Sequence, residues 1–219
     1  MLKQCILVML FTTIINICFA QNNKPYKCGW IDKDTAQLNK TYNINLKYWN
    51  VQKGETIASV GAQNGNLEVR ISLFIDSINW TLQDIDSSCL NQQEFEKVLN
   101  YYEKIGGKKI NSQFKLLLGS TTNTNLLSNT YDRILLINVY HELTKKQEIL
   151  AQINTALKPQ GSLVIMERMG NKKGKKRRDC NHIMPYEPTF LEELKQLHFE
   201  LKSKTMEKNI SYYIFRKIN

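Results

Sequence analysis

The sequence predicts an α/β domain built on a doubly wound sheet of seven strands. Three observations support this fold class: a strand that runs into a glycine turn and a helix at residues 56–75, a regular alternation of apolar strands and helices after it, and a closing pair of strands joined by a short turn. Alternating elements of this kind imply parallel strands with right-handed crossovers. The short turn near the C-terminus implies that the last strand runs antiparallel.

Each element follows from local composition and spacing. Short apolar runs bounded by turn residues predict strands at residues 56–60, 78–84, 114–118, 133–138, 162–167, 199–206 and 210–218. Helices are predicted at residues 66–75, 91–105, 145–157 and 190–198, after a polar helical lead-in at 32–49. In the helix at 91–105 apolar residues recur every three or four positions, and Gly106 and Gly107 end it.

The first twenty residues have the pattern of a cleaved secretory signal. A short, positively charged start precedes an apolar run at residues 6–19. Cys18 and Ala20 are small residues at the two positions that a signal peptidase recognises, and a polar segment follows them. The run is shorter than the ~20 apolar residues that span a bilayer, which argues against a membrane anchor. We therefore expect residues 1–20 to be removed and the product to be exported, to a bacterial periplasm or as a secreted protein. A lead-in at 21–52 and a main domain at 53–219 would remain.

Three cysteines follow the predicted signal: Cys28, Cys89 and Cys180. No two of them have metal-ligand spacing, so the sequence predicts no metal site. An oxidising compartment allows one disulfide and one remaining thiol. Cys89 lies near the start of a predicted helix and is expected to be buried, so the expected pair is Cys28 with Cys180.

Much of the net charge of +10 comes from one run, Lys172 to Arg178. Like charges repel and extend the chain, which favours a solvated loop. The alternative is contact with an anionic surface, such as phosphorylated lipid headgroups. The run has no interleaved aromatic residue, so a nucleic-acid partner is not favoured. No later segment approaches a transmembrane span.

Two further segments carry a family resemblance. Residues 131–143, Tyr-Asp-Arg-Ile-Leu-Leu-Ile-Asn-Val-Tyr-His-Glu-Leu, form a buried strand with a polar exit, and residues 157–168 form a helix end, a turn and another buried strand. Together with the glycine turn they resemble the class I S-adenosylmethionine-dependent methyltransferases, as an exported, small, single-domain member with a degenerate first motif. The resemblance extends from about Lys53 to the C-terminus. It implies a Rossmann-like sheet with S-adenosylmethionine as cofactor, and methyl transfer to an unidentified acceptor.

The resemblance also implies where the cofactor binds. Glycine at a strand end allows the backbone to approach a ligand closely, and the helix that follows presents free N–H groups. Asp84 lies where a strand-terminal carboxylate holds ribose hydroxyls. The implied cofactor residues are Gly61, Ala62, Gln63, Gly65, Asp84, Ile85 and Asn138.

The chain departs from the family pattern at several positions. Ser59 stands where an acidic residue normally contacts the methionine end of the cofactor, and Gln63 stands where the family has a third glycine. After the third strand, Gly119-Ser120-Thr121 replaces an acidic residue that meets the adenine. These departures favour an alternative function: an exported binding protein that keeps the methyltransferase fold but has lost cofactor binding and activity.

Two histidines are candidate catalytic residues. His141 follows the fourth predicted strand and could remove a proton from the acceptor, because imidazole titrates near neutral pH. The alternative is that His141 only caps or packs at a helix start. His182 lies just after the basic run, in a segment that resembles one in related methyltransferases, and Asp179 three residues before it could orient its ring.

Overall fold

The computed structural model describes residues 25–218. The predicted signal at residues 1–20 and its cleavage site lie outside the described residues. Among the helices of residues 25–218, none combines the length and the hydropathy of a membrane span.

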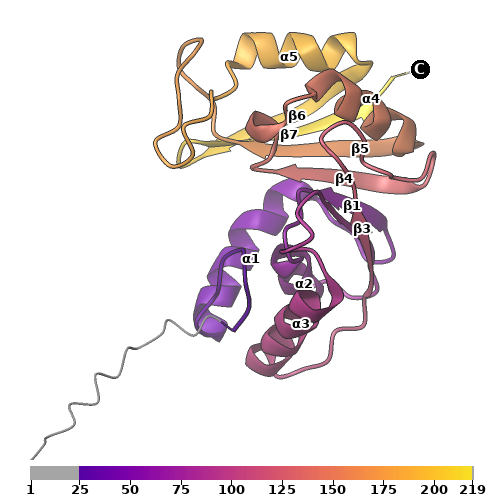
Figure 1. Cartoon of the computed structure of the whole chain (residues 1–219), viewed down its shortest axis with the longest axis vertical. Coiled ribbons are helices and arrows are strands. Elements are labelled where there is room, and N and C mark those ends of the chain that lie inside the picture. The colour runs from indigo at the N-terminus through magenta and orange to yellow at the C-terminus, as the bar shows by residue number, and fades with distance from the viewer. Residues whose placement is uncertain (1–24, 219) are drawn as a thin grey trace, which may run out of the picture.

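One seven-stranded sheet runs through the molecule (Figure 1). In the order of pairing, its strands are β3 (Gln113–Leu118), β2 (Asn79–Asp84), β1 (Thr56–Val60), β4 (Tyr131–Ile137), β5 (Leu157–Glu167), β7 (Ile210–Lys217) and β6 (Phe199–Glu207). Strands β1 to β5 pair in parallel, and β7 is antiparallel to both β5 and β6. The predicted fold class, with the last strand antiparallel, is confirmed. The strand order reverses between β1 and β4, which is where open α/β sheets hold their ligands.

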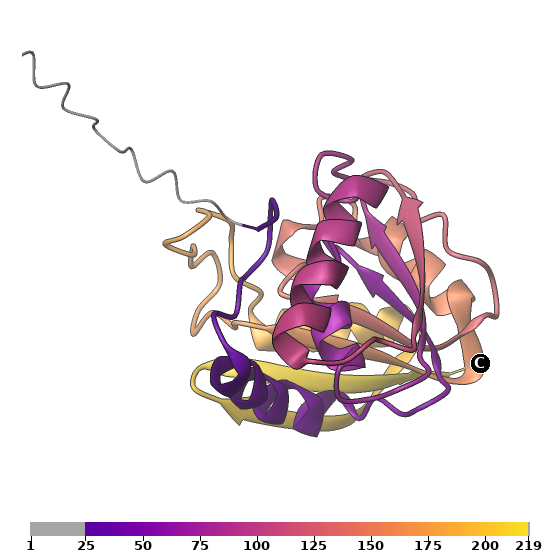
Figure 2. The same cartoon turned by 90° about the horizontal axis from the view of Figure 1, so that it is seen from below.

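Helices cover both faces of the sheet (Figures 1 and 2). One face carries α1 (Thr35–Trp49), α2 (Asn66–Ser72) and α3 (Gln92–Gly106), and the other carries α4 (Lys146–Ala156) and α5 (Glu187–Gln196). A short 3-10 turn, η1 (Tyr140–Glu142), follows β4. Helix α5 begins three residues before the predicted position, because Pro188 is tolerated in the first helical turn.

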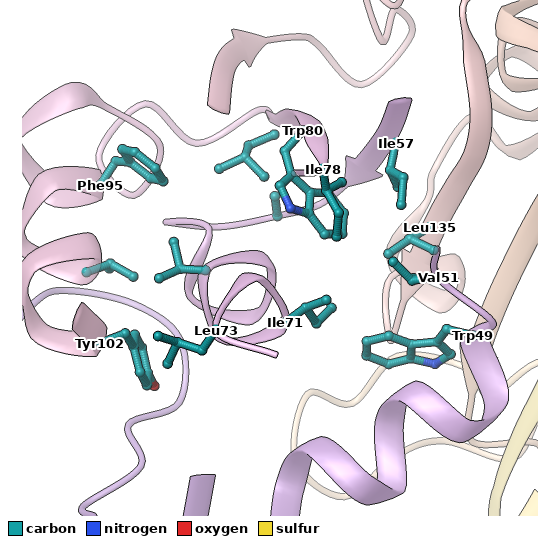
Figure 3. Close-up of a cluster of buried hydrophobic side chains, with 14 of the residues drawn as sticks. Trp49, Val51, Ile57, Ile71, Leu73, Ile78, Trp80, Phe95, Tyr102 and Leu135 are labelled. Carbon is teal, nitrogen blue, oxygen red and sulfur yellow. The ribbon is translucent and has the colours of Figure 1, made fainter. Parts of the chain in front are cut away.

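A core of large side chains fixes α2 between the sheet and α3 (Figure 3). Trp80 on β2 is buried and its indole N–H donates to the Ser72 hydroxyl at the end of α2, at 2.9 Å. On the other side of α2, Phe95 and Tyr102 of α3 are buried in the same cluster. Since α2 begins directly after the glycine turn, this packing also fixes the turn at the edge of the sheet.

The disulfide joins Cys28 to Cys89, with 5.9 Å between the two Cα atoms, so the predicted Cys28–Cys180 pair is wrong. The expectation that Cys89 is buried is confirmed. Cys89 does precede α3, but its sulfur faces the N-terminal segment, while Cys180 is a free thiol beside His141. Cys28 and Cys89 come close only in the folded protein, when α2 packs against α3. The spacing of the cysteines in the sequence does not show that they pair.

Candidate active site

A cavity of about 610 Å³ lies at the carboxyl ends of β1, β2 and β4. We call it the first cavity. Six of the seven predicted cofactor residues line it: Gly61, Ala62, Gln63, Asp84, Ile85 and Asn138. The seventh, Gly65, is not a lining residue. A Cβ there would lie 2.5 Å from a methyl carbon of Leu82, so Gly65 allows α2 to pack closely on β2.

The glycine turn brings backbone to the wall of the first cavity. Gly61 has a φ of +76°, and a Cβ at this position would meet the Val139 side chain at 2.5 Å. The Gly61 and Ala62 N–H groups both donate to the carbonyl oxygen of Gln83, at 2.8 and 3.0 Å. Gln63 keeps the left-handed conformation of a glycine, with a φ of +52°, although it has a side chain. The turn therefore retains its shape despite the departure at Gln63.

Asp84 links this turn to the loop after β2. Its carboxylate accepts three backbone N–H groups, from Gln63 at 2.7 Å, Ile85 at 2.7 Å and Asp86 at 2.9 Å. Two of these bonds end on Oδ1 and one on Oδ2. A carboxylate has about four acceptor positions, so Oδ2 keeps capacity for a hydroxyl group.

A buried carboxylate lies beside the position of the missing family acid. Glu68 is in the first turn of α2, its side chain has no solvent exposure, and it lines the first cavity together with Ser59. Burial raises the pKa of Glu68 to about 7, and the Ser59 hydroxyl partly offsets that rise. Neither Glu68 oxygen makes a well-formed hydrogen bond within the described residues. Such a group is costly unless a ligand satisfies it.

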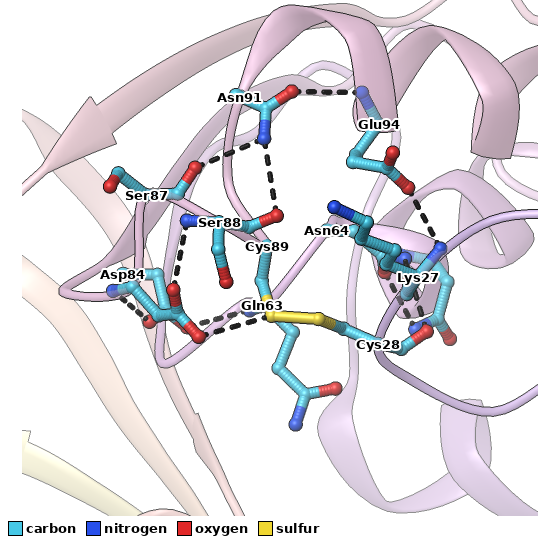
Figure 4. The surroundings of a disulfide bond; sticks show 12 residues. Lys27, Cys28, Gln63, Asn64, Asp84, Ser87, Ser88, Cys89, Asn91 and Glu94 are labelled. Atoms are coloured by element: carbon cyan, nitrogen blue, oxygen red, sulfur yellow. Dashed lines mark hydrogen bonds between the residues drawn. A yellow bond between two sulfur atoms is a disulfide. The ribbon is translucent and has the colours of Figure 1, made fainter.

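The N-terminal segment closes one side of the first cavity (Figure 4). Gly29 and Trp30 line the cavity, and the Cys28–Cys89 disulfide ties this segment to the loop before α3. The Asn64 amide also donates to the carbonyl oxygens of Lys27 and Cys28. The Trp30 side chain is 63% exposed. Tyr26 and Trp49 are in the core.

A second cavity, of about 650 Å³, adjoins the first. Both are lined by Glu142, Leu143 and Thr144, so the two cavities share a wall. His141 and His182, the two predicted catalytic residues, both line the second cavity, with 5.8 Å between their ring centroids. The structure thus brings together two histidines that are 41 positions apart in the sequence.

Glu167 is a partner of His141 that sequence reasoning missed. It is the last residue of β5 and is fully buried, and its Oε2 lies 2.8 Å from Nδ1 of His141. A carboxylate at this distance fixes the Nδ1–H tautomer and leaves Nε2 with a lone pair. The sequence does contain a signal for this contact, because Glu167 is a charged residue at the end of an apolar strand. That strand, β5, lies beside β4, which His141 follows.

The basic run is only partly a solvated loop. Its lysines and Arg178 are exposed, but the Arg177 side chain is 8% exposed and points inward. Arg177 Nη1 lies 3.2 Å from Nε2 of His141. Its guanidinium also pairs with Asp179 through two bonds, which hold the pKa of Asp179 well below its usual range. Asp179 therefore orients Arg177, whereas its suggested role in orienting the His182 ring stays untested.

Comparison with known proteins agrees with this architecture. A family model described as a methyltransferase domain matches residues 87–165, which includes β3, β4 and most of β5. No curated protein sequence matches the chain. The match leaves out the glycine turn, where the sequence departs most from the family.

Solved structures extend the likeness to nearly the whole described chain. An S-adenosylmethionine-dependent methyltransferase from Aquifex aeolicus is 17% identical with a TM-score of 0.61, and the match covers 85% of this chain and 100% of that one. One from Methanosarcina mazei is 14% identical with a TM-score of 0.62, covering 81% and 98%. The [4+2]-cyclase SpnF is 13% identical with a TM-score of 0.60, covering 88% and 86%. At these identities the structures show a shared fold.

Proposed function

We propose that this chain is a class I S-adenosylmethionine-dependent methyltransferase, which transfers a methyl group from a cofactor in the first cavity to an acceptor in the second. The observation that carries the proposal is the shared wall at Glu142, Leu143 and Thr144. This wall supports the proposal because the expected cofactor residues line one cavity, and the buried pair of His141 and Glu167 lies at the other. Methyl transfer needs such an arrangement, because it depends mainly on proximity and alignment.

The residues of the first cavity fit S-adenosylmethionine. Asp84 has remaining acceptor capacity for a ribose hydroxyl, and the glycine turn leaves room for the ligand beside the backbone. Glu68 supplies the carboxylate that Ser59 cannot, and it would pair with the ammonium group of the cofactor's methionine end. When bound, the cofactor supplies an activated sulfonium methyl group, and the chain supplies orientation.

His141 is suited to accept the acceptor's proton. Its Nδ1–H donates to Glu167, so Nε2 can take a proton as the acceptor attacks the methyl group, once the Arg177 guanidinium 3.2 Å away has moved off that nitrogen. The imidazolium that forms is then stabilised by the buried Glu167 carboxylate. His182 lies across the second cavity and would contact the acceptor.

The charges around the second cavity favour an anionic acceptor. Lys146 of α4 and two lysines of the basic run, Lys173 and Lys176, line it. Glu142 and Glu193 line it as well, but the three lysines leave an excess of positive charge, and such an excess attracts ligands of the opposite sign. An acceptor with a phosphate or carboxylate group fits this lining, either as a free small molecule or as part of an anionic surface.

We expect Glu167→Gln to lower the rate of methyl transfer by about 100-fold or more, since general-base catalysis contributes on this scale. The measurement is transfer of a labelled methyl group from S-adenosylmethionine into fractions of the host envelope. His198→Asn is the matched control, because His198 lies outside both cavities and has a φ of +60° that asparagine tolerates. Equal labelling by wild type and Glu167→Gln would contradict the assigned base.

A second candidate function is a binding protein without methyl transfer. Ser59 and Gln63 favour it, because they stand where the family pattern has an acidic residue and a glycine. If this alternative holds, no fraction accepts the label, and the purified chain does not bind S-adenosylmethionine.

We also propose that the protein is exported. The Cys28–Cys89 disulfide supports an oxidising compartment, where such bonds persist. N-terminal sequencing of the protein purified from its host should then find Gln21 as the first residue. A soluble cytoplasmic product that begins at Met1 would contradict export.

A further inference from the structure

Two side chains that line the second cavity, His141 and His182, and the neighbouring Cys180 have the chemistry of metal ligands. One ligand atom each from His141, Cys180 and His182 lies within 4.8 Å of the other two. They come from η1 and from the segment after the basic run, and His141 is 39 positions before Cys180. The sequence predicted no metal site because only the spacing between cysteines was considered, and the fold brings this set together from distant positions.

His141 and Cys180 already have the spacing of two ligands on one tetrahedral zinc ion. Cys180 Sγ lies 3.6 Å from Nε2 of His141. Zinc binds sulfur at about 2.3 Å and imidazole nitrogen at about 2.0–2.1 Å, and a tetrahedral angle between these bonds separates sulfur from nitrogen by roughly 3.5 Å. The two atoms therefore need almost no movement to share one ion. His182 is on an exposed segment and can complete the set by a side-chain rotation.

The buried partner of His141 is the one that metal sites use. A ligating histidine almost always donates its other ring N–H to a carboxylate or carbonyl group, which orients the ring and strengthens the ligand. Glu167 Oε2 makes this contact with Nδ1 at 2.8 Å, so Nε2 is directed toward Cys180 and His182.

We propose that His141, Cys180 and His182 bind a divalent transition-metal ion of the zinc type. Mixed thiolate and imidazole ligands suit Zn²⁺, and three protein ligands leave a fourth position open. His141 and His182 line the second cavity, so a ligand bound in that cavity would be near the ion. On binding, the Cys180 thiol releases its proton to solvent, because the thiolate is the ligand.

Arg177 competes with the ion for the same nitrogen. Its Nη1 lies 3.2 Å from Nε2 of His141, and its positive charge opposes a cation there. The guanidinium retains Asp179 and Asn138 as partners when it leaves Nε2. Nε2 of His141 can therefore either bind the ion or accept a proton, but it cannot do both at once. The proposed metal site does not depend on the proposed methyl transfer.

Metal-free protein titrated with Co²⁺ tests the proposal, because a thiolate ligand gives Co²⁺ a charge-transfer absorption band that other ligands do not. We expect one ion per chain, confirmed with Zn²⁺ by elemental analysis. Cys180→Ser should abolish the charge-transfer band. Glu167→Gln should weaken affinity by about 10- to 100-fold, the usual effect of removing an outer partner of a ligand.

Two further variants make the test specific. Arg177→Gln should bind Co²⁺ more tightly than wild type, because it removes the positive charge that competes for Nε2 of His141. If Arg177 only supported the fold, its replacement would not increase the affinity for Co²⁺. His198→Asn should bind as wild type does. The proposal is overturned if the wild-type chain binds no stoichiometric Co²⁺ or Zn²⁺, or if a folded Cys180→Ser variant keeps the full charge-transfer band.

Discussion

Asp84→Ala is expected to weaken binding of S-adenosylmethionine by roughly 30- to 1,000-fold, or about 2–4 kcal/mol. The loss has two sources. A charge-assisted hydrogen bond from a ribose hydroxyl to Oδ2 disappears, and such bonds contribute about 1.5–3 kcal/mol. The glycine turn also loses the carboxylate that holds Gln63, Ile85 and Asp86 in place. Calorimetric titration of both proteins measures the difference.

Asp132→Asn is the matched control for Asp84→Ala. Asp132 is also a carboxylate on a strand of the same sheet, and it accepts from the Thr56 N–H and pairs with Lys158, but it does not line the first cavity. We expect Asp132→Asn to lower stability slightly and leave affinity unchanged. If Asp84→Ala binds the cofactor as tightly as wild type, the assignment of Asp84 is wrong even where the enzyme class is right.

Glu68→Gln is expected to remove a pH dependence from the stability of the cofactor-free protein. In the wild type the pKa of Glu68 is raised from 4.5 to about 7, so the folded protein holds this proton more tightly than the unfolded chain. The stabilisation is fully present below pH 4.5 and is lost as the pH rises toward 7. The shift corresponds to at most about 3 kcal/mol. Urea unfolding at several pH values measures it.

The same group should make cofactor binding depend on pH with the opposite sign. An ammonium group beside Glu68 favours the carboxylate, so binding of S-adenosylmethionine below pH 7 releases a proton. Affinity of the wild type should therefore rise between pH 5 and pH 7, and that of Glu68→Gln should stay nearly level. An equal pH dependence in the two proteins would show that Glu68 does not meet the ammonium group.

The sheet was predictable because each strand carries its own apolar run. The strand at residues 56–60 has the predicted bounds, and Asp84 ends β2 where its motif requires. Where the observed strand bounds differ from the predicted ones, pairing with an adjacent strand sets them. The sequence alone indicates a helix end and a turn at Leu157, but β5 begins there because Leu157 pairs with Tyr131 of β4.

The parts of the site that sequence reasoning missed depend on contacts between distant elements. Glu68 is a charged residue on a predicted helix, and only the packing of α2 against the sheet buries it beside Ser59. Glu167 meets His141 because β4 and β5 are neighbours, and Cys28 meets Cys89 because the N-terminal segment crosses the glycine turn. Local patterns give the elements, whereas these pairs follow from their arrangement.

Calorimetric titration of the wild-type chain with S-adenosylmethionine, and with its demethylated product, tests the central claim most directly. The proposed site predicts one binding site per chain for each of the two ligands, because Asp84, the glycine turn and Glu68 would contact groups that the two share. Absence of binding by both ligands to folded protein would contradict the claim that the first cavity is a cofactor site.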